Sequence, residues 1–393
     1  MSNARPRGVD RSGERGAALV QMTIAMLAIT AFSTFVMDYG VFWVARRQAQ
    51  NAADAGALAG AIAVASGENP DMGGSAMLAS QAAARANLIW GEPPSVLLAG
   101  LNGLSDVRIG PCASTPTHQC VATDVFRTAG RTNPLPTYFG RLAEIDTQDV
   151  QATATAEVIP ANESACVQHW GIADHWTDDK GDWWSTASTP MWDAGLDVYT
   201  PPSQTSAGSG LRVADGSGQL CAPPGCDYGR QLLLQNQDRR LARFYGRLDF
   251  GGGGCVAGAL DDSSNRLRRF LNPSTVAGIN GLFDADPDAC WSTEPGCGQD
   301  LDERCPYGCV YSPLHGVNAS PRIVVVRSFD PAGVATLVTS DQVNLVALFL
   351  EGHVNPATRD LPVRVFVAPA AYNPNGTTLT EEASFLRTAV LVR

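Results

Sequence analysis

The sequence has few charged residues and contains no cysteine in its first 111 positions. Charged residues make up 17% of its 393 residues, below the roughly 25% that is typical of a soluble domain. Acidic residues outnumber basic ones by 39 to 28, which gives a net charge of −11. Nucleic-acid binding depends on clustered Lys and Arg, so we expect no nucleic-acid partner. Hydrophobic residues reach 45%, which allows a sizeable core and excludes global disorder.

The sequence also lacks the common catalytic motifs. It has no H-E-x-x-H, no G-x-S-x-G and no G-x-x-x-x-G-K-[ST]. The glycine run 251–254 is followed by Cys255 and has no phosphate-binding lysine, so it is interpreted as a turn. We therefore expect no enzymatic activity, no catalytic residue, no bound metal and no cofactor. A membrane-anchored hydrolase is the least favoured function.

One uninterrupted apolar segment predicts a membrane-spanning helix. Residues 17–37 contain no charged side chain, and at 1.5 Å per residue these 21 positions span about 31 Å, close to one hydrocarbon core. A cleaved signal peptide is the main alternative, but its apolar core runs only about 7–15 residues. A second alternative is a buried core helix of a soluble protein. Basic residues before the segment weakly favour a cytoplasmic N-terminus: Arg5, Arg7, Arg11 and Arg15.

The position of the cysteines agrees with that topology. All ten follow residue 111, as expected if the rest of the chain lies in an oxidising compartment such as the periplasm or the cell surface. The zinc alternative is disfavoured because the pairs lack the two-residue spacing of zinc knuckles. We expect disulfides, with a pairing that sequence cannot assign, among Cys112, Cys120, Cys166, Cys221, Cys226, Cys255, Cys290, Cys297, Cys305 and Cys309.

The predicted helix continues beyond the membrane. Residues 45–65 are rich in alanine and free of proline, and Gly67 is expected to end the helix. Gly56 and Gly60 lie one turn apart and predict a seam where another element approaches closely, the alternative being plain Ala-rich composition. Asp38, at the membrane exit, is either a solvated charge or the partner of an intermolecular Arg.

The remaining pattern predicts an α+β fold in four parts. These are a cytoplasmic arm (1–15), a transmembrane and juxtamembrane helix (16–66), a small α+β domain (67–160) and a Cys/Trp-rich, mostly β extracytoplasmic domain (161–393). Alternation over 148–159 indicates a half-buried strand. We expect further helices at 75–90, 137–145, 230–248 and 260–272, and further strands at 105–110, 121–128, 323–326, 343–350, 363–367 and 385–392.

The N-terminal segment RGAALVQMTIAMLAITAFSTFVMDYGVFWVARRQAQNAADAGALAGA resembles Tad (Flp) pilus-assembly proteins of the TadE/TadG type. The resemblance implies a non-enzymatic, bacterial, single-pass inner-membrane protein with a small pilin-like α+β unit, whose partners are other Tad/Flp pilus subunits. Its likeness to type IV prepilins fails at Gln21, where processed members carry Glu, so we expect the segment to be retained. The motif and packing residues that we single out are Asp38, Gly40, Arg46, Arg47, Asn51, Asp54, Gly56 and Gly60.

A surface-binding module is the alternative function. In that case the helix is only an anchor, and a Trp-rich region near His169 and His175 binds polysaccharide, although such tryptophans are more often buried. Calcium is a second ligand to consider, because Asp284, Asp286 and Asp288 resemble the start of a calcium loop. That loop lacks Gly at its sixth position and Glu at its twelfth, so a solvated acidic loop is favoured.

Overall fold

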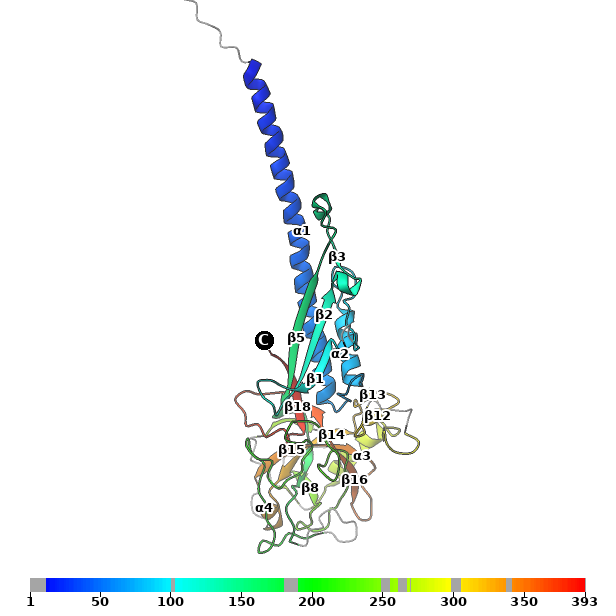
Figure 1. Ribbon diagram of the computed structural model, residues 1–393. Coiled ribbons are helices and arrows are strands. Elements are labelled where there is room, and N and C mark those ends of the chain that lie inside the picture. The colour runs from blue at the N-terminus through cyan, green and yellow to red at the C-terminus, as the bar shows by residue number, and fades with distance from the viewer. Residues whose placement is uncertain are drawn as a thin grey trace, which may run out of the picture. The chain divides into compact units, whose positions relative to one another are not determined.

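The computed structural model describes residues 12–99, 103–179, 190–248, 255–260, 267–268, 270–297, 305–336 and 341–392 (Figure 1). The chain divides into two compact units. The first consists of the chain up to Ala53 with Arg85–Val96 and Asp124–Thr153, and the second of Asp54–Ala84, Leu97–Thr123 and Ala154–Arg393. The expected arm lies largely outside the described residues, as do Trp183, Trp184 and the glycine run 251–254.

Helix α1 (Ser12–Ala65) is a single helix of 54 residues without an internal break (Figure 1). Its sequence contains no proline, and alanine is the residue with the highest helix propensity. The helix ends where expected, because Gly67 adopts a positive φ of 85° that other residues avoid. There the backbone N–H of Gly67 donates to Val64 O at 3.0 Å, and that of Glu68 to Ala63 O at 3.0 Å.

The C-terminal turns of α1 pack closely against their neighbours through glycine. A Cβ on Gly56 would lie 2.8 Å from Thr123 Cγ2 and 3.0 Å from Ala84 Cβ. A Cβ on Gly60 would lie 2.7 Å from the Val121 side chain. Gly56 and Gly60 therefore lie where α1 closely approaches helix α2 (Ser75–Ala86) and strand β2 (Gln119–Arg127) of the same chain, and we call this contact the seam.

A five-stranded sheet has the order β1-β2-β5-β18-β17. Its strands are β1 (Val107–Pro111), β2, β5 (Val150–Pro160), β18 (Leu386–Val392) and β17 (Ala368–Pro369). The alternating burial of β2 and of much of β5 reflects the period-two pattern of their sequences. Strand β18 pairs antiparallel with β5, from Arg387 opposite Pro160 to Val392 opposite Thr155. The last strand of the chain thus completes the sheet that the sequence assigned to 67–160 alone, and the expected boundary at 160 does not separate two structural domains.

A larger, eight-stranded sheet forms the centre of the second unit. Its order is β10-β8-β6-β14-β15-β16-β7, with β9 paired to β6. The strands are β6 (Glu163–Ala173), β7 (Gln231–Leu234), β8 (Tyr245–Leu248), β9 (Cys255–Ala259), β10 (Leu267–Arg268), β14 (Ile323–Phe329), β15 (Gln342–Leu350) and β16 (Leu361–Phe366). The core includes buried Trp170, Trp176 and Trp291, which are 1%, 1% and 2% exposed. These three tryptophans serve packing and do not form a sugar-binding surface.

The smaller elements complete the described fold. They are helices α3 (Pro273–Asp284) and α4 (Pro331–Thr336), the 3-10 turns η1 (Ala129–Arg131) and η2 (Gly140–Ala143), the ladder of β3 (Leu135–Pro136) with β4 (Thr147–Gln148), and the three-stranded sheet of β11 (Cys290–Trp291), β12 (Val310–Ser312) and β13 (Gly316–Val317).

Three helix predictions were wrong. Residues 230–248 contain strands β7 and β8, because their leucines pair into a sheet. Of the helix expected at 260–272, residues 261–266 and 269 lie outside the described residues, and Leu267–Arg268 form strand β10. Helix α3 begins only after that range, at Pro273, where the Asn272 side chain accepts the Thr275 N–H at 2.8 Å and Pro occupies the first turn. Residues 137–145 form only the single turn η2.

All ten cysteines are paired. The bridges are Cys112–Cys120, Cys166–Cys255, Cys221–Cys226, Cys290–Cys297 and Cys305–Cys309. Four of them close short loops, whereas Cys166–Cys255 joins β6 to β9 across 89 positions. The expected architecture, an α+β fold with a long apolar N-terminal helix and a disulfide-rich β region, is confirmed.

Candidate functional site: the clasp at the end of the membrane segment

Asp38 binds the backbone of a loop that lies 100 residues later in the sequence. Its Oδ1 accepts the N–H of Tyr138 at 2.9 Å, and its Oδ2 accepts those of Phe139 at 3.0 Å and Gly140 at 2.6 Å. Three successive N–H groups converge on the carboxylate at the first turn of η2, where helical N–H groups have no partner within the turn. Asp38 is therefore neither fully solvated nor in need of a cationic partner. We call this contact the clasp.

The loop that the clasp binds, which we call the tip (residues 137–146, between β3 and β4), is closed by its own hydrogen bonds. The Thr137 N–H donates to Asp146 O at 3.1 Å, and the Ile145 N–H to Gly140 O at 3.0 Å. A side chain at Gly140 would collide, since its Cβ would lie 2.8 Å from Ile145 O. In Figure 1 the chain beyond β3 extends beside α1. The tip therefore presents its N–H groups to Asp38 from a defined conformation.

Other contacts hold α1 within the same unit. Gln48 Oε1 accepts the Trp90 N–H at 2.8 Å, and Gln50 Nε2 donates to Thr153 O at 3.3 Å. Away from α1 in the same unit, Arg127, which is only 2% exposed, donates to Ile89 O at 2.5 Å and pairs with Glu92 at 3.0 Å. The sequence offered no signal for these pairings, because each joins segments that are far apart in the chain.

Before Asp38, helix α1 presents an apolar surface on all sides. It is the helix among the described residues that is long and apolar enough to cross a membrane, and no residue of its most apolar window is buried. Leu19, Met22 and Phe32 are about 70% exposed, at 69%, 71% and 69%. An exposed apolar stretch of this length is what a lipid environment requires and what a soluble core helix does not show.

The predicted motif residues after Asp38 divide into two groups. Gly56 and Gly60 are buried in the seam, whereas a Cβ on Gly40 would point into open space, at least 4 Å from the neighbouring elements that the structure describes. Arg46, Arg47 and Asn51 are exposed, and Asp54 is half-buried. The Arg47 guanidinium lies 4.0 Å from the centroid of the Trp43 ring. The structure thus brings together Asp38 with the tip, and the two glycines with α2 and β2.

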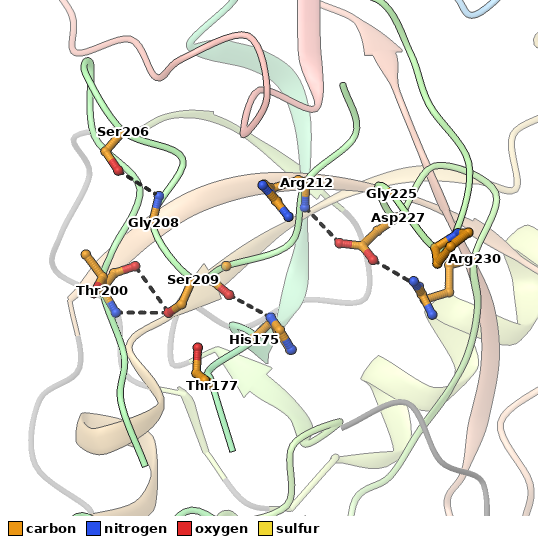
Figure 2. Close-up of a pocket in the computed structure, with 12 residues that line it drawn as sticks. His175, Thr177, Thr200, Ser206, Gly208, Ser209, Arg212, Gly225, Asp227 and Arg230 are labelled. Carbon is orange, nitrogen blue, oxygen red and sulfur yellow. Dashed lines mark hydrogen bonds and ion pairs between the residues drawn. The ribbon is translucent and has the colours of Figure 1, made fainter. Parts of the chain in front are cut away.

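A separate polar hollow of about 470 Å³ lies in the second unit (Figure 2). Asp227 accepts the Arg212 N–H at 2.9 Å and pairs with Arg230 Nε at 2.9 Å on one side of the hollow. On the other side His175 Nδ1 lies 2.6 Å from the Ser209 carbonyl oxygen. Hydroxyl and backbone groups supply most of the remaining lining: Thr177, Thr200, Ser206, Gly208, Gly210 and Gly225.

Burial sets the protonation of the groups at this hollow. It lowers the pKa of His175 to about 4, so the ring is neutral at pH 7 and donates its Nδ1 proton to Ser209 O. Burial also raises the pKa of the adjacent Asp174 to about 6, against the opposing hydrogen bond from Tyr199 Oη at 2.9 Å. The hollow offers hydrogen-bonding groups and one exposed guanidinium, that of Arg212. Such a set suits a polar or anionic ligand.

The acidic residues proposed for calcium do not converge. Asp286 is fully buried, and its two oxygens accept the hydroxyls of Ser312 at 3.0 Å and Ser320 at 2.6 Å. Asp284 pairs instead with His353 Nε2 at 2.7 Å. These contacts give the calcium expectation no support. Within the described ranges, the acidic group with metal-like spacing is Asp178, Asp179 and Asp197, which carries no further sign of a ligand.

One histidine lies between two carboxylates. His118 Nδ1 is 2.6 Å from Glu157 Oε1, and its Nε2 is 2.8 Å from Glu381 Oε1. The hydrogen bond to Glu381 is the largest cause that raises the pKa of His118 above 6.5, and the bond to Glu157 adds to it, while partial burial opposes both. The three residues connect the turn before β2, strand β5 and the segment before β18 within the second unit.

Comparison with known families bears on the helix that carries Asp38. Residues 16–64 match the family model described as "Putative Flp pilus-assembly TadE/G-like". No match was found among curated proteins or among solved structures. The matched range begins at the apolar segment, includes Asp38 and the glycine seam, and ends one residue before α1 does. Helix α1 is thus similar to the TadE/G-like Flp pilus-assembly proteins, and the rest of the chain lies outside the matched range.

Proposed function

We propose that this chain is a non-enzymatic, membrane-anchored subunit of a bacterial Tad/Flp pilus assembly system, with a structural or anchoring role in the envelope. The observation that carries the proposal is the coincidence of the family match with an exposed apolar helix: both occupy the same part of α1. The clasp supports an anchoring role, because it ties the end of that apolar stretch to a folded loop of the same unit.

The orientation that we propose places the N-terminus in the cytoplasm and the bulk of the chain beyond the inner membrane. All ten cysteines follow the apolar segment and are paired, and such bridges form and persist in oxidising compartments. The partners in this proposal are other subunits of the pilus machinery.

The test combines topology with piliation. Spheroplasts are treated with protease and a membrane-impermeant thiol reagent, before and after reduction. We expect the chain to fractionate with the inner membrane, to be cleaved from outside, and to gain reactive thiols only after reduction. Mild crosslinking in membranes followed by pull-down is expected to recover pilus ATPase, platform or secretin subunits. Recovery of a soluble, thiol-reduced chain would refute the proposal.

A surface-binding role is the second candidate, and the polar hollow of Figure 2 is the observation that favours it. Deleting 161–393 would not separate the two roles, because it also removes β18 from the sheet that contains β5. Arg212→Ser is the sharper change, since that side chain is exposed in the hollow. Normal pili with reduced adhesion would support the binding role, and loss of pili with a folded protein would support the structural one.

A further inference from the structure

The tip carries apolar and aromatic side chains that no other part of its unit covers fully. Tyr138 is 57% exposed and Ile145 is 52% exposed, and Phe139 between them is 36% exposed. A single exposed apolar residue on a surface is ordinary, but three on one ten-residue loop form a patch. Because the loop is closed by its own hydrogen bonds, the three side chains are presented together.

The clasp fixes the level of this patch along α1. Asp38 follows the start of the candidate span, Ala18, by 20 residues, which is about 30 Å along the helix axis and equals the thickness of one hydrocarbon core. The N–H groups of the tip lie within 3.3 Å of the Asp38 carboxylate. When α1 spans a bilayer, the tip is therefore at the membrane surface and not in bulk water.

The tip and α1 also enclose an apolar groove of about 810 Å³. On the helix side the groove extends from Phe42 back to Leu27, and Leu27 precedes Asp38 by 11 residues, or about 16 Å of helix. On the other side it is lined by Phe139 and Ile145 of the tip. A groove that begins at the headgroup level and continues along the lipid-facing helix has the shape and chemistry to take an acyl chain.

Aromatic side chains at the same level match the composition of a membrane interface. Tyr39 is 56% exposed, and Trp43 is 47% exposed with Arg47 stacked on its ring. Tyr138 adds a third amphipathic ring, whose hydroxyl accepts the Trp90 Nε1–H at 3.2 Å. Tyr and Trp concentrate at the boundary of hydrocarbon and water, where an apolar ring and a polar group are both satisfied.

We propose that the tip is a second membrane contact of this protein, seated in the interface of the leaflet that α1 leaves, with a lipid acyl chain in the groove. The proposal rests on the proposed membrane anchoring. The three charged residues of the tip, Arg141, Glu144 and Asp146, are compatible with this position, because all are exposed and can reach the headgroup layer. Arg141 lies 4.0 Å from Asp146. The contact adds a second point of attachment to a single-pass anchor, which limits rotation of the unit about the axis of α1.

The test measures depth in the bilayer with spin labels on the full chain. All ten native cysteines are paired, so one introduced cysteine gives a single labelling site. Ile145→Cys and Tyr138→Cys report on the tip, Leu27→Cys on α1, and Leu314→Cys, at a 70% exposed position, on open solvent. The protein is reconstituted in nanodiscs of phosphatidylethanolamine and phosphatidylglycerol, and collision rates with oxygen and with a water-soluble nickel chelate are compared.

We expect the labels at 145 and 138 to favour oxygen over nickel, at a depth of about 5–10 Å, between the values at 27 and 314. If 27 lies in lipid while both tip labels match 314, the inference is wrong and the proposed function stands. If 27 is also in water, both are wrong. If the tip labels are immobilised and shielded from both reagents, a protein segment and not lipid fills the groove, and the inference is likewise overturned.

Discussion

Replacing Asp38 with alanine should release the tip from α1 while leaving both elements folded. The carboxylate accepts the backbone N–H groups of Tyr138, Phe139 and Gly140, and the shortest N···O distances are 2.9 Å, 3.0 Å and 2.6 Å. A hydrogen bond to a charged group contributes about 1.5–3 kcal/mol when water is excluded. The clasp is half-exposed, so water can replace part of each bond in the variant, and we expect a total cost of about 2 kcal/mol for the three.

That cost should appear as local opening and not as global unfolding. A difference of about 2 kcal/mol corresponds to a roughly 30-fold larger population of the open state, and to equally faster exchange, since each 1.4 kcal/mol is a factor of ten. Hydrogen exchange of the Tyr138, Phe139 and Gly140 amides, measured by mass spectrometry on the protein in nanodiscs, reports this opening directly. The amides of the eight-stranded sheet serve as an internal reference, because they exchange through larger openings.

Two further variants provide an intermediate case and a control for the exchange measurement. Asp38→Asn keeps one acceptor oxygen but directs an NH₂ group at the same donors, so its exchange rates should lie between wild type and Asp38→Ala. Thr23→Ala is the control, because the Thr23 hydroxyl donates to Leu19 O of its own helix at 2.9 Å and Thr23 does not line the groove beside the tip. Unchanged exchange of the three tip amides in Asp38→Ala would refute the clasp as a stabilising contact.

Three other predictions follow from contacts in the second unit. Gly56→Leu should lower the free energy of unfolding by about 1–3 kcal/mol through overpacking, whereas Gly40→Leu, in open space, should leave the melting temperature unchanged. The raised pKa of His118 means that its ion pairs stabilise the fold fully below pH 6.5 and are lost as pH rises through the folded-state value. The stability of wild type relative to His118→Gln should therefore decline above pH 6.5 in denaturant titrations. Replacing both Cys166 and Cys255 with serine should cost about 4 kcal/mol, because this bridge closes a loop of 89 positions.

Each of these has a clear contrary outcome. Equal melting temperatures for the two glycine variants would mean that the seam can relax around a leucine. A pH profile that is parallel for wild type and the histidine variant would remove the ion pairs as a source of stability. A cost well below 2 kcal/mol for the serine pair would show that the unfolded chain is already compact between β6 and β9.

The local sequence determined the parts of this protein that depend on near neighbours. Twenty-one uncharged residues are enough to span a hydrocarbon core when they are helical. The absence of proline and the abundance of alanine extended the same helix to Ala65. The helix ends before Gly67, because Gly67 has a φ of 85° that few residues other than glycine adopt. Period-two alternation located β5, strand-like composition located β1 and β2, and the apolar runs located β14, β15 and β16.

Only the tertiary structure decided what these elements contact. Asp38 is one carboxylate on a helix, and nothing near it in the sequence indicates that its partners are N–H groups at positions 138–140. The pairing of β18 with β5 spans more than half of the chain, and residues 230–248 became strands because partners elsewhere completed their hydrogen bonds. Helix propensity and periodicity depend on residues that are close in the sequence. The clasp, the strand order and the Cys166–Cys255 bridge depend instead on contacts between segments that are far apart in the sequence and meet only when the chain folds.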